Sequence, residues 1–133
     1  MSYLLDTNVC IKYINGTNQK VSNRFQSNRR DQIFLCDIVK FELYYGAYKS
    51  FNTSKNLESL AVFFDEFISL PFDSKAAEIC GFIRANLAKQ GRPIGVYDLQ
   101  IAAIALINNL VLVTHNISVF SHVEGLKYED WEV

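Results

Sequence analysis

The sequence predicts an α/β protein in which a central, mainly parallel sheet is covered by helices on both faces. Short apolar runs alternate along the chain with longer segments of helical periodicity, and the runs lack the in-and-out alternation of a strand that faces water. Strands that are apolar throughout are typical of parallel sheets buried on both faces. With 133 residues, half of them apolar and 20% charged, residues 1–133 are expected to form a single domain.

The order of the predicted elements follows from periodicity and from capping residues. The predicted strands are short runs bounded by polar or turn residues: 2–6, 33–36, 70–72, 110–114 and, as an edge strand, 125–130. The predicted helices repeat apolar residues every three or four positions: 7–16, 19–28, 38–49, 53–69, 74–90 and 97–108. Thr7 or Asn8 can cap the first helix and Gly16 can end it, while Asp37 and Asp73 are placed as caps of two later helices.

Composition and charge exclude several classes of protein. The three cysteines, Cys10, Cys36 and Cys80, are odd in number and far apart, which favours reduced thiols in the core of a cytosolic protein. The start of the chain lacks the pattern of a signal peptide, and the apolar run 99–113 is shorter than the ~20 residues that a membrane crossing needs. We therefore expect a cytoplasmic protein with no membrane partner.

Three of the fourteen acidic residues are embedded among apolar neighbours: Asp6, Glu42 and Asp98. Asp6 ends the first strand, Glu42 follows the second strand by about one helical turn, and Asp98 lies in the first turn of a very apolar helix. Taken singly, Asp6 and Asp98 could be helix caps and Glu42 could pair with a lysine or arginine. Because the carboxyl ends of parallel strands form the ligand-binding edge of a sheet, we expect the three carboxylates to lie together there.

Three carboxylates at one apolar edge repel one another, and burial strengthens the repulsion. A divalent cation removes the conflict, and oxygen ligands favour Mg²⁺ or Mn²⁺, whereas zinc would prefer the histidine and cysteine ligands that the predicted site lacks. Such an ion polarises a phosphate and lowers the pKa of a bound water, which is the chemistry of phosphodiester hydrolysis. Thr114 and Asn116, which end a later strand, are candidate auxiliary residues at this acidic centre (Asp6, Glu42 and Asp98).

Net charge, which is −1, gives no overall signal for nucleic acid, but residues 20–55 are basic and the tail after Glu124 is acidic. This asymmetry is compatible with a basic face for a phosphate backbone, and equally with a solvated helix surface. Four cations are candidates for contact with such a backbone: Lys12, Lys40, Arg84 and Arg92.

Five segments carry a resemblance to a known family: YLLDTNVCIKY at 3–13, VKFELYYGAYKS at 39–50, GRPIGVYDLQIAAIAL at 91–106, LVLVTHN at 110–116 and VEGLKYEDW at 123–131. In order and spacing they resemble the VapC-type PIN-domain ribonucleases, the toxins of bacterial and archaeal toxin–antitoxin pairs. The resemblance runs almost from end to end, and the first and third segments are its most specific parts.

The resemblance implies a PIN fold, a three-layer α/β/α sandwich, and Mg²⁺- or Mn²⁺-dependent endonuclease activity on structured RNA, either tRNA or rRNA. It also implies a homodimer and a cognate VapB-type antitoxin whose C-terminal segment lies across the active-site groove. By motif position Asp6 and Asp98 match the core metal ligands of the family, and Glu42 matches its second acidic residue. These three are accordingly expected to be both the metal ligands and the catalytic residues.

The sequence departs from the family pattern after the strand 110–114. Members of the family often carry a fourth acidic residue there, whereas this chain has Asn116, and Val119 stands where a glutamate is common. His115 is also unusual at its position and is interpreted as a polar residue at the end of a strand. This departure favours hydrolysis with one metal ion, or with a second ion that arrives on the substrate phosphate.

Two other functions compete with the nuclease. A signalling receiver domain also combines a parallel sheet with clustered aspartates and Mg²⁺, but it needs a second acidic residue beside Asp6 and a lysine after a late strand, and this sequence has neither. The other alternative is a catalytically weak PIN module that acts mainly by binding antitoxin or RNA. Divalent-dependent cleavage of RNA separates the enzyme from the module.

Overall fold

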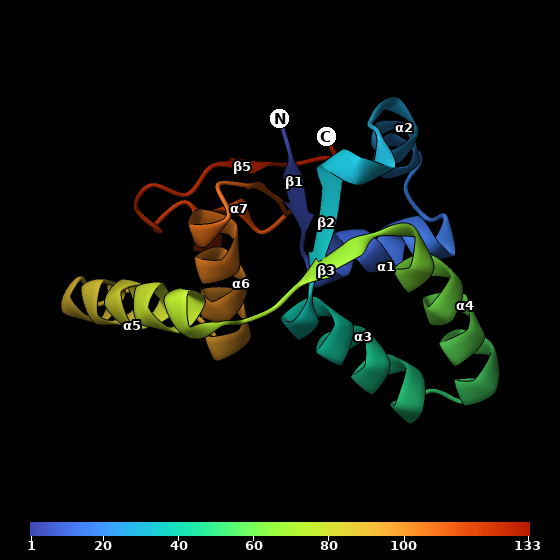
Figure 1. Ribbon diagram of the computed structural model, residues 1–133, viewed down its shortest axis with the longest axis horizontal. Coiled ribbons are helices and arrows are strands. Elements are labelled where there is room, and N and C mark those ends of the chain that lie inside the picture. Colours follow the sequence, from blue (N-terminus) through green and yellow to red (C-terminus); the bar gives the residue numbers. More distant parts are fainter.

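The computed structural model describes residues 1–133 and contains a five-stranded sheet flanked by seven helices (Figure 1). The strands are β1 (Tyr3–Leu5), β2 (Ile33–Cys36), β3 (Ile68–Leu70), β4 (Val111–Val113) and β5 (Tyr128–Glu129). The helices are α1 (Thr7–Asn15), α2 (Gln19–Ser27), α3 (Asp37–Lys49), α4 (Thr53–Glu66), α5 (Ser74–Lys89), α6 (Val96–Ile107) and α7 (Ile117–Phe120). In Figure 1, α5 and α6 pack together at one end of the view, while α1, α3 and α4 lie at the other.

All strand pairs are parallel, and β1 lies at the centre of the order β3-β2-β1-β4-β5. Tyr3 is in register with Ile33 of β2 on one side and with Val111 of β4 on the other. The chain therefore builds the sheet outward from β1 in one direction and then returns to build the other half. The direction reverses between β1 and β4, which is where open parallel sheets bind their ligands. This arrangement confirms the predicted α/β class.

Several predicted boundaries and caps need correction. Asp6, rather than Thr7 or Asn8, caps α1, because its side chain accepts a hydrogen bond from the Val9 amide. Asp37 lies inside the first turn of α3, where its carboxylate accepts a hydrogen bond from the Ser69 hydroxyl instead of from the helix.

Further differences concern the element list. Strand β3 begins two residues before the predicted 70–72, because pairing with β2 rather than local pattern sets its register. The helix α7 and a 3-10 turn at Arg30–Gln32 were not predicted, since short helices carry little periodicity. The predicted cap of α5 is confirmed: Asp73 accepts a hydrogen bond from the Ala76 amide.

A core of 33 buried apolar residues surrounds the sheet. Trp131 is fully buried near the end of the chain, and its ring meets Tyr3 and Phe25 edge-on at centroid distances of 5.2 and 5.6 Å. Aromatic edge-to-face pairs of this kind contribute about 0.5–1.5 kcal/mol beyond the area that they bury. The C-terminal tail is thereby fixed against β1. Helix α6 supplies the most apolar helical surface, yet no helix has the length and apolar character needed to cross a membrane.

The cysteines provide a test of this packing. Cys10 is fully buried and burial raises its pKa, while burial raises the pKa of Cys36 to about 11. Cys80 is only partly buried, which corrects the expectation of three core thiols. Because the thiolate is the reactive form, we expect Ellman's reagent to label one thiol in the native protein and three in the denatured protein. The native-state signal should disappear in Cys80→Ser, and labelling of that variant before unfolding would contradict the packing of β2 and α1.

Candidate active site

Asp6 is the only buried charged residue of the chain, and it lies immediately after β1. Its carboxylate accepts a hydrogen bond of 3.0 Å from the Val9 amide, and its own amide donates to the carbonyl of Val113 in β4. Burial raises the pKa of Asp6 to about 6, against the lowering effect of the Thr114 side chain and the Val9 amide. Asp6 is thus both the cap of α1 and a carboxylate held out of water.

Asp98 reaches the same region from the first turn of α6. Gly95 is the N-cap of this helix, and no side chain makes the capping hydrogen bond, so Asp98 is not the cap that one interpretation of the sequence suggested. The side chain is partly buried, and burial together with the charge of Glu42 raises the pKa of Asp98. Its charge also helps to raise the pKa of Asp6. Glu42 is therefore close enough to Asp98, and Asp98 close enough to Asp6, for each charge to disfavour ionisation of the neighbouring aspartate.

Glu42 approaches from α3, one turn into the helix that follows β2. The Thr7 hydroxyl donates a hydrogen bond of 2.7 Å to Glu42 Oε1 and so connects the first turn of α1 to α3. This contact replaces the lysine or arginine partner that the sequence allowed for Glu42. Carboxylate oxygens from Asp6 after β1, from α3 and from α6 thus come together, and no lysine or arginine side chain pairs with any of the three. This set of oxygen ligands suits a hard divalent ion.

A cavity of about 430 Å³ opens beside Asp6. Its other lining residues come from α1, from the segment after β4 and from the C-terminal tail: Asn8, Ile11, Lys12, His115, Asn116 and Glu132. Thr114 lies beneath them, fully buried, and its hydroxyl accepts a hydrogen bond of 3.0 Å from the Asn116 amide. Both predicted auxiliary residues therefore lie next to Asp6, at the edge where the strand order reverses.

Comparisons with known proteins agree with this arrangement. The chain matches the PIN domain family over residues 3–126. It is 39% identical to the tRNA(fMet)-specific endonuclease VapC of Shigella flexneri, with 98% of each chain covered. The chain belongs to the VapC family of PIN-domain ribonucleases. A crystal structure of DNA-bound VapBC from Salmonella typhimurium superposes with a TM-score of 0.92 at 37% identity, over 98% of each chain. VapBC2 from Rickettsia felis, bound to a promoter DNA fragment, gives 0.89 at 33% identity, covering 98% of this chain and 99% of that one.

Membership of the VapC family excludes the alternative of a receiver domain. The four cations predicted to contact the substrate lie at different places in the structure. Lys12 lines the Asp6 cavity, where it forms an ion pair with Glu132. The structure does not bring the other three cations there. Lys40 Nζ lies 4.9 Å from the ring centroid of Phe64. Arg92 contacts His122, and Arg84 is exposed on α5.

Sequence reasoning missed Glu132, which it assigned to an acidic surface tail. The side chain of Glu132 is only 7% exposed, lines the Asp6 cavity and contributes to the raised pKa of Asp6. This VapC-family chain thus has a fourth carboxylate near the acidic centre, supplied by the tail instead of by position 116 or 119. The adjacent Trp131 was the available signal, since a buried tryptophan holds its neighbours against the fold.

The burial of Asp6 predicts a pH-dependent change in stability. Its pKa of about 6 in the folded chain exceeds the ordinary value of 3.8, so ionisation opposes folding; the cost is absent below pH 4 and complete above pH 6. In EDTA at pH 8, Asp6→Asn should raise the free energy of unfolding by about 2–3 kcal/mol, because asparagine keeps the cap without the charge. Urea unfolding at pH 4.5 should show only about a third of this gain, because Asp6 is then largely protonated in the folded chain.

Asp73→Asn is the matched control for this measurement. Asp73 caps α5 through the same kind of hydrogen bond to a backbone amide, but it is exposed. Its substitution should leave stability nearly unchanged at both pH values. An equal gain for both variants at pH 8 would show that the charge of the cap, and not its burial at the acidic centre, is responsible.

Proposed function

We propose that the chain is the toxin of a toxin–antitoxin pair and hydrolyses phosphodiester bonds in structured RNA with the help of Mg²⁺ or Mn²⁺. The observation that carries this proposal is the placement of three carboxylates from separate elements at the switch point of a parallel sheet: Asp6 directly after β1, Glu42 on α3 and Asp98 on α6. The names of the curated relatives, endonuclease or ribonuclease VapC, support the reaction type. The site of action would be the cytoplasm, where such RNA is found.

In the proposed mechanism the three carboxylates hold the divalent ion, which when bound supplies an activated water and neutralises charge on the phosphate. Asp6 is held in place by the Val9 amide and by Thr114, so one face of its carboxylate stays directed at the cavity. Glu42 is oriented by the Thr7 hydroxyl. Burial of these groups excludes competing water and strengthens each electrostatic contact made during the reaction.

The substrate would enter through the Asp6 cavity, whose rim offers Asn8, Asn116 and the ammonium group of Lys12. These groups are hydrogen-bond donors that suit phosphate and ribose oxygens, and they carry little base specificity. Two relatives, from Shigella flexneri and Salmonella typhimurium, are named tRNA(fMet)-specific endonucleases. A tRNA is therefore the first substrate to test, with rRNA as the second.

Loss of a carboxylate from the acidic centre should abolish cleavage. We expect Asp98→Asn and Glu42→Gln to lower the cleavage rate roughly 100-fold or more, because each removes a charged ligand while keeping the side-chain shape. Mg²⁺ titration calorimetry should show weaker binding for both variants. Glu78→Gln, an exposed carboxylate on α5, is the control and should match the wild type.

Two results would overturn the proposal. Cleavage that persists in EDTA would remove the divalent ion from the mechanism. A wild-type chain that binds RNA but does not cut it with any divalent ion, while still arresting growth, would favour the alternative of a binding module.

The antitoxin would bind a second feature, a groove between α1, α3 and α4. This groove has a volume of about 500 Å³, and its apolar lining is Ile11, Ile14, Leu43, Ala47 and Leu60. Glu42 also lines it, and Ile11 is shared with the Asp6 cavity, so the groove leads to the acidic centre. A bound peptide with apolar anchors would thus reach the acidic centre and cover it, as expected of an inhibitor.

Gly46 allows the groove to be filled without disturbing the site. A Cβ at Gly46 would meet no atom within 4 Å, and Gly46 lies inside helix α3 at the wall of the open groove, so we expect Gly46→Trp to fold. We expect it to weaken antitoxin binding at least 10-fold by isothermal titration while leaving RNA cleavage intact, so that the antitoxin no longer relieves toxicity. Gly46→Ala and Gly81→Trp, which place a small side chain in the groove and a large one on α5, should bind normally. Normal binding by Gly46→Trp would place the antitoxin elsewhere.

A further inference from the structure

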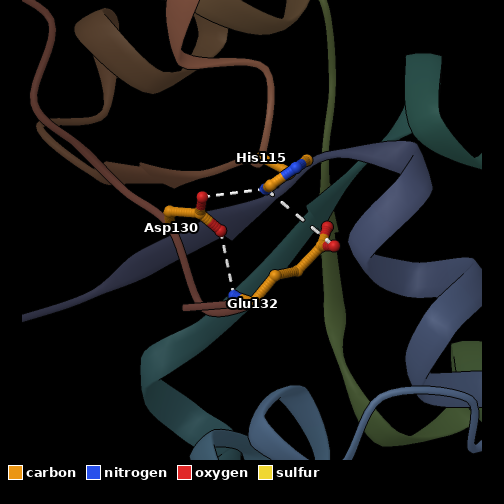
Figure 2. A group of neighbouring side chains, drawn as sticks. All are labelled: His115, Asp130 and Glu132. Carbon is orange, nitrogen blue, oxygen red and sulfur yellow. Dashed lines mark hydrogen bonds and ion pairs between the residues drawn. The ribbon is translucent and has the colours of Figure 1, made fainter.

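We propose that His115, Asp130 and Glu132 form a second metal site, which binds a divalent transition ion of the Zn²⁺ type at the rim of the Asp6 cavity. This tail cluster joins the turn after β4 to the C-terminal tail (Figure 2). His115 Nδ1 lies 2.8 Å from Asp130 Oδ2 and 3.9 Å from Glu132 Oε1, and one ligand atom from each residue falls within 4.8 Å of the other two.

One oxygen of the Glu132 carboxylate has no partner among the side chains and backbone groups of the protein. The side chain is 7% exposed, and its Oε2 atom is buried without a hydrogen-bond partner, the only such side-chain atom in the chain. Lys12 pairs with the other oxygen, Oε1, and so leaves Oε2 free. A buried carboxylate oxygen without a partner is costly, and a cation bound at Oε2 would satisfy it. Figure 2 shows the Glu132 carboxylate directed toward His115.

The fold holds the three side chains in place. β4 and β5 are parallel neighbours with Val113 paired to Glu129, so the segments that follow them emerge side by side. His115 follows one strand, and Asp130 and Glu132 follow the other. Trp131, which stands between Asp130 and Glu132 in the sequence, is fully buried. Asp130 Oδ1 also accepts a hydrogen bond of 2.9 Å from the Glu132 amide. The cluster is thus anchored by the core instead of belonging to a loose tail.

The ligand set selects the type of ion. One imidazole nitrogen and two carboxylate oxygens suit Zn²⁺, whereas Mg²⁺ prefers oxygen alone. Bonds of about 2.0–2.2 Å place the ligand atoms of a tetrahedral ion roughly 3.3–3.6 Å apart. The His115–Asp130 pair, now at 2.8 Å, would therefore open slightly, and a pair as far apart as 4.8 Å would close by about 1–1.5 Å. The His115 side chain is 59% exposed, which leaves an open side for water or a substrate oxygen. Its three ligands are not those of the acidic centre, although Glu132 and His115 line the same cavity as Asp6, and Zn²⁺ binding there can be measured whether or not the chain cleaves RNA.

The test is a titration of the purified protein with Zn²⁺ in the presence of millimolar Mg²⁺, which occupies the acidic centre. We expect one equivalent of Zn²⁺ to bind to the wild type, and at least ~10-fold weaker binding to His115→Ala and to Glu132→Gln. His122→Ala is the matched control, because the chain has two histidines and His122 lies against Arg92, away from the cluster. It should bind as the wild type does, and so should Asp98→Asn.

A second readout separates coordination from a change in fold. In the wild type, the ring signals of His115 should shift in the NMR spectrum on addition of Zn²⁺, while those of His122 stay in place; circular dichroism of the variants should match the wild type. Undiminished Zn²⁺ binding by His115→Ala would overturn the proposal. So would the loss of Zn²⁺ binding in Asp98→Asn alone, because the ion would then occupy the acidic centre.

Discussion

Burial of the Asp6 carboxylate at the carboxyl end of β1 is the constraint around which the structure is organised. β1 is the central strand, and the Asp6 amide donates a hydrogen bond to Val113 of β4, so the residue lies at a largely covered position between neighbouring strands. The Val9 amide and Thr114 offset part of the free-energy cost of burying the charged Asp6 carboxylate. The protein does not offset all of it, so the pKa of Asp6 is raised to about 6. A bound cation, as proposed for the acidic centre, would stabilise the ionised form of such a carboxylate.

The helices supply the other carboxylates because each starts near the same edge of the sheet. Helix α3 begins directly after β2 and carries Glu42 at its second turn, and α6 carries Asp98 in its first turn. The hydrogen bond from Thr7 to Glu42 joins α1 to α3. The position of the Glu42 carboxylate therefore depends on where α1 begins. Precision at the acidic centre therefore comes from the regular elements, which hold side chains more rigidly than loops do.

The C-terminal tail adds a feature that the strands and helices alone do not provide. Trp131 packs against β1 and α2 and so carries its neighbour Glu132 to the wall of the cavity. There Lys12 pairs with one oxygen of Glu132 while the other stays buried and unbonded. The charge missing at Asn116 is thus compensated from the tail, which brings a fourth carboxylate and a histidine close to Asp6. The surroundings of the acidic centre are accordingly richer in metal ligands than the segment after β4 suggests.

The sequence by itself determined the α/β class, most of the helices, and the three carboxylates of the acidic centre, because apolar periodicity and charges inside apolar segments are local signals. Tertiary structure alone decided the rest. Whether Asp6 or its neighbours caps α1, where β3 begins, and which cations face the cavity all depend on contacts between segments far apart in the chain. Glu132 is the clearest case: its sequence neighbourhood is acidic and polar, and only the packing of Trp131 against β1 makes its carboxylate a buried one.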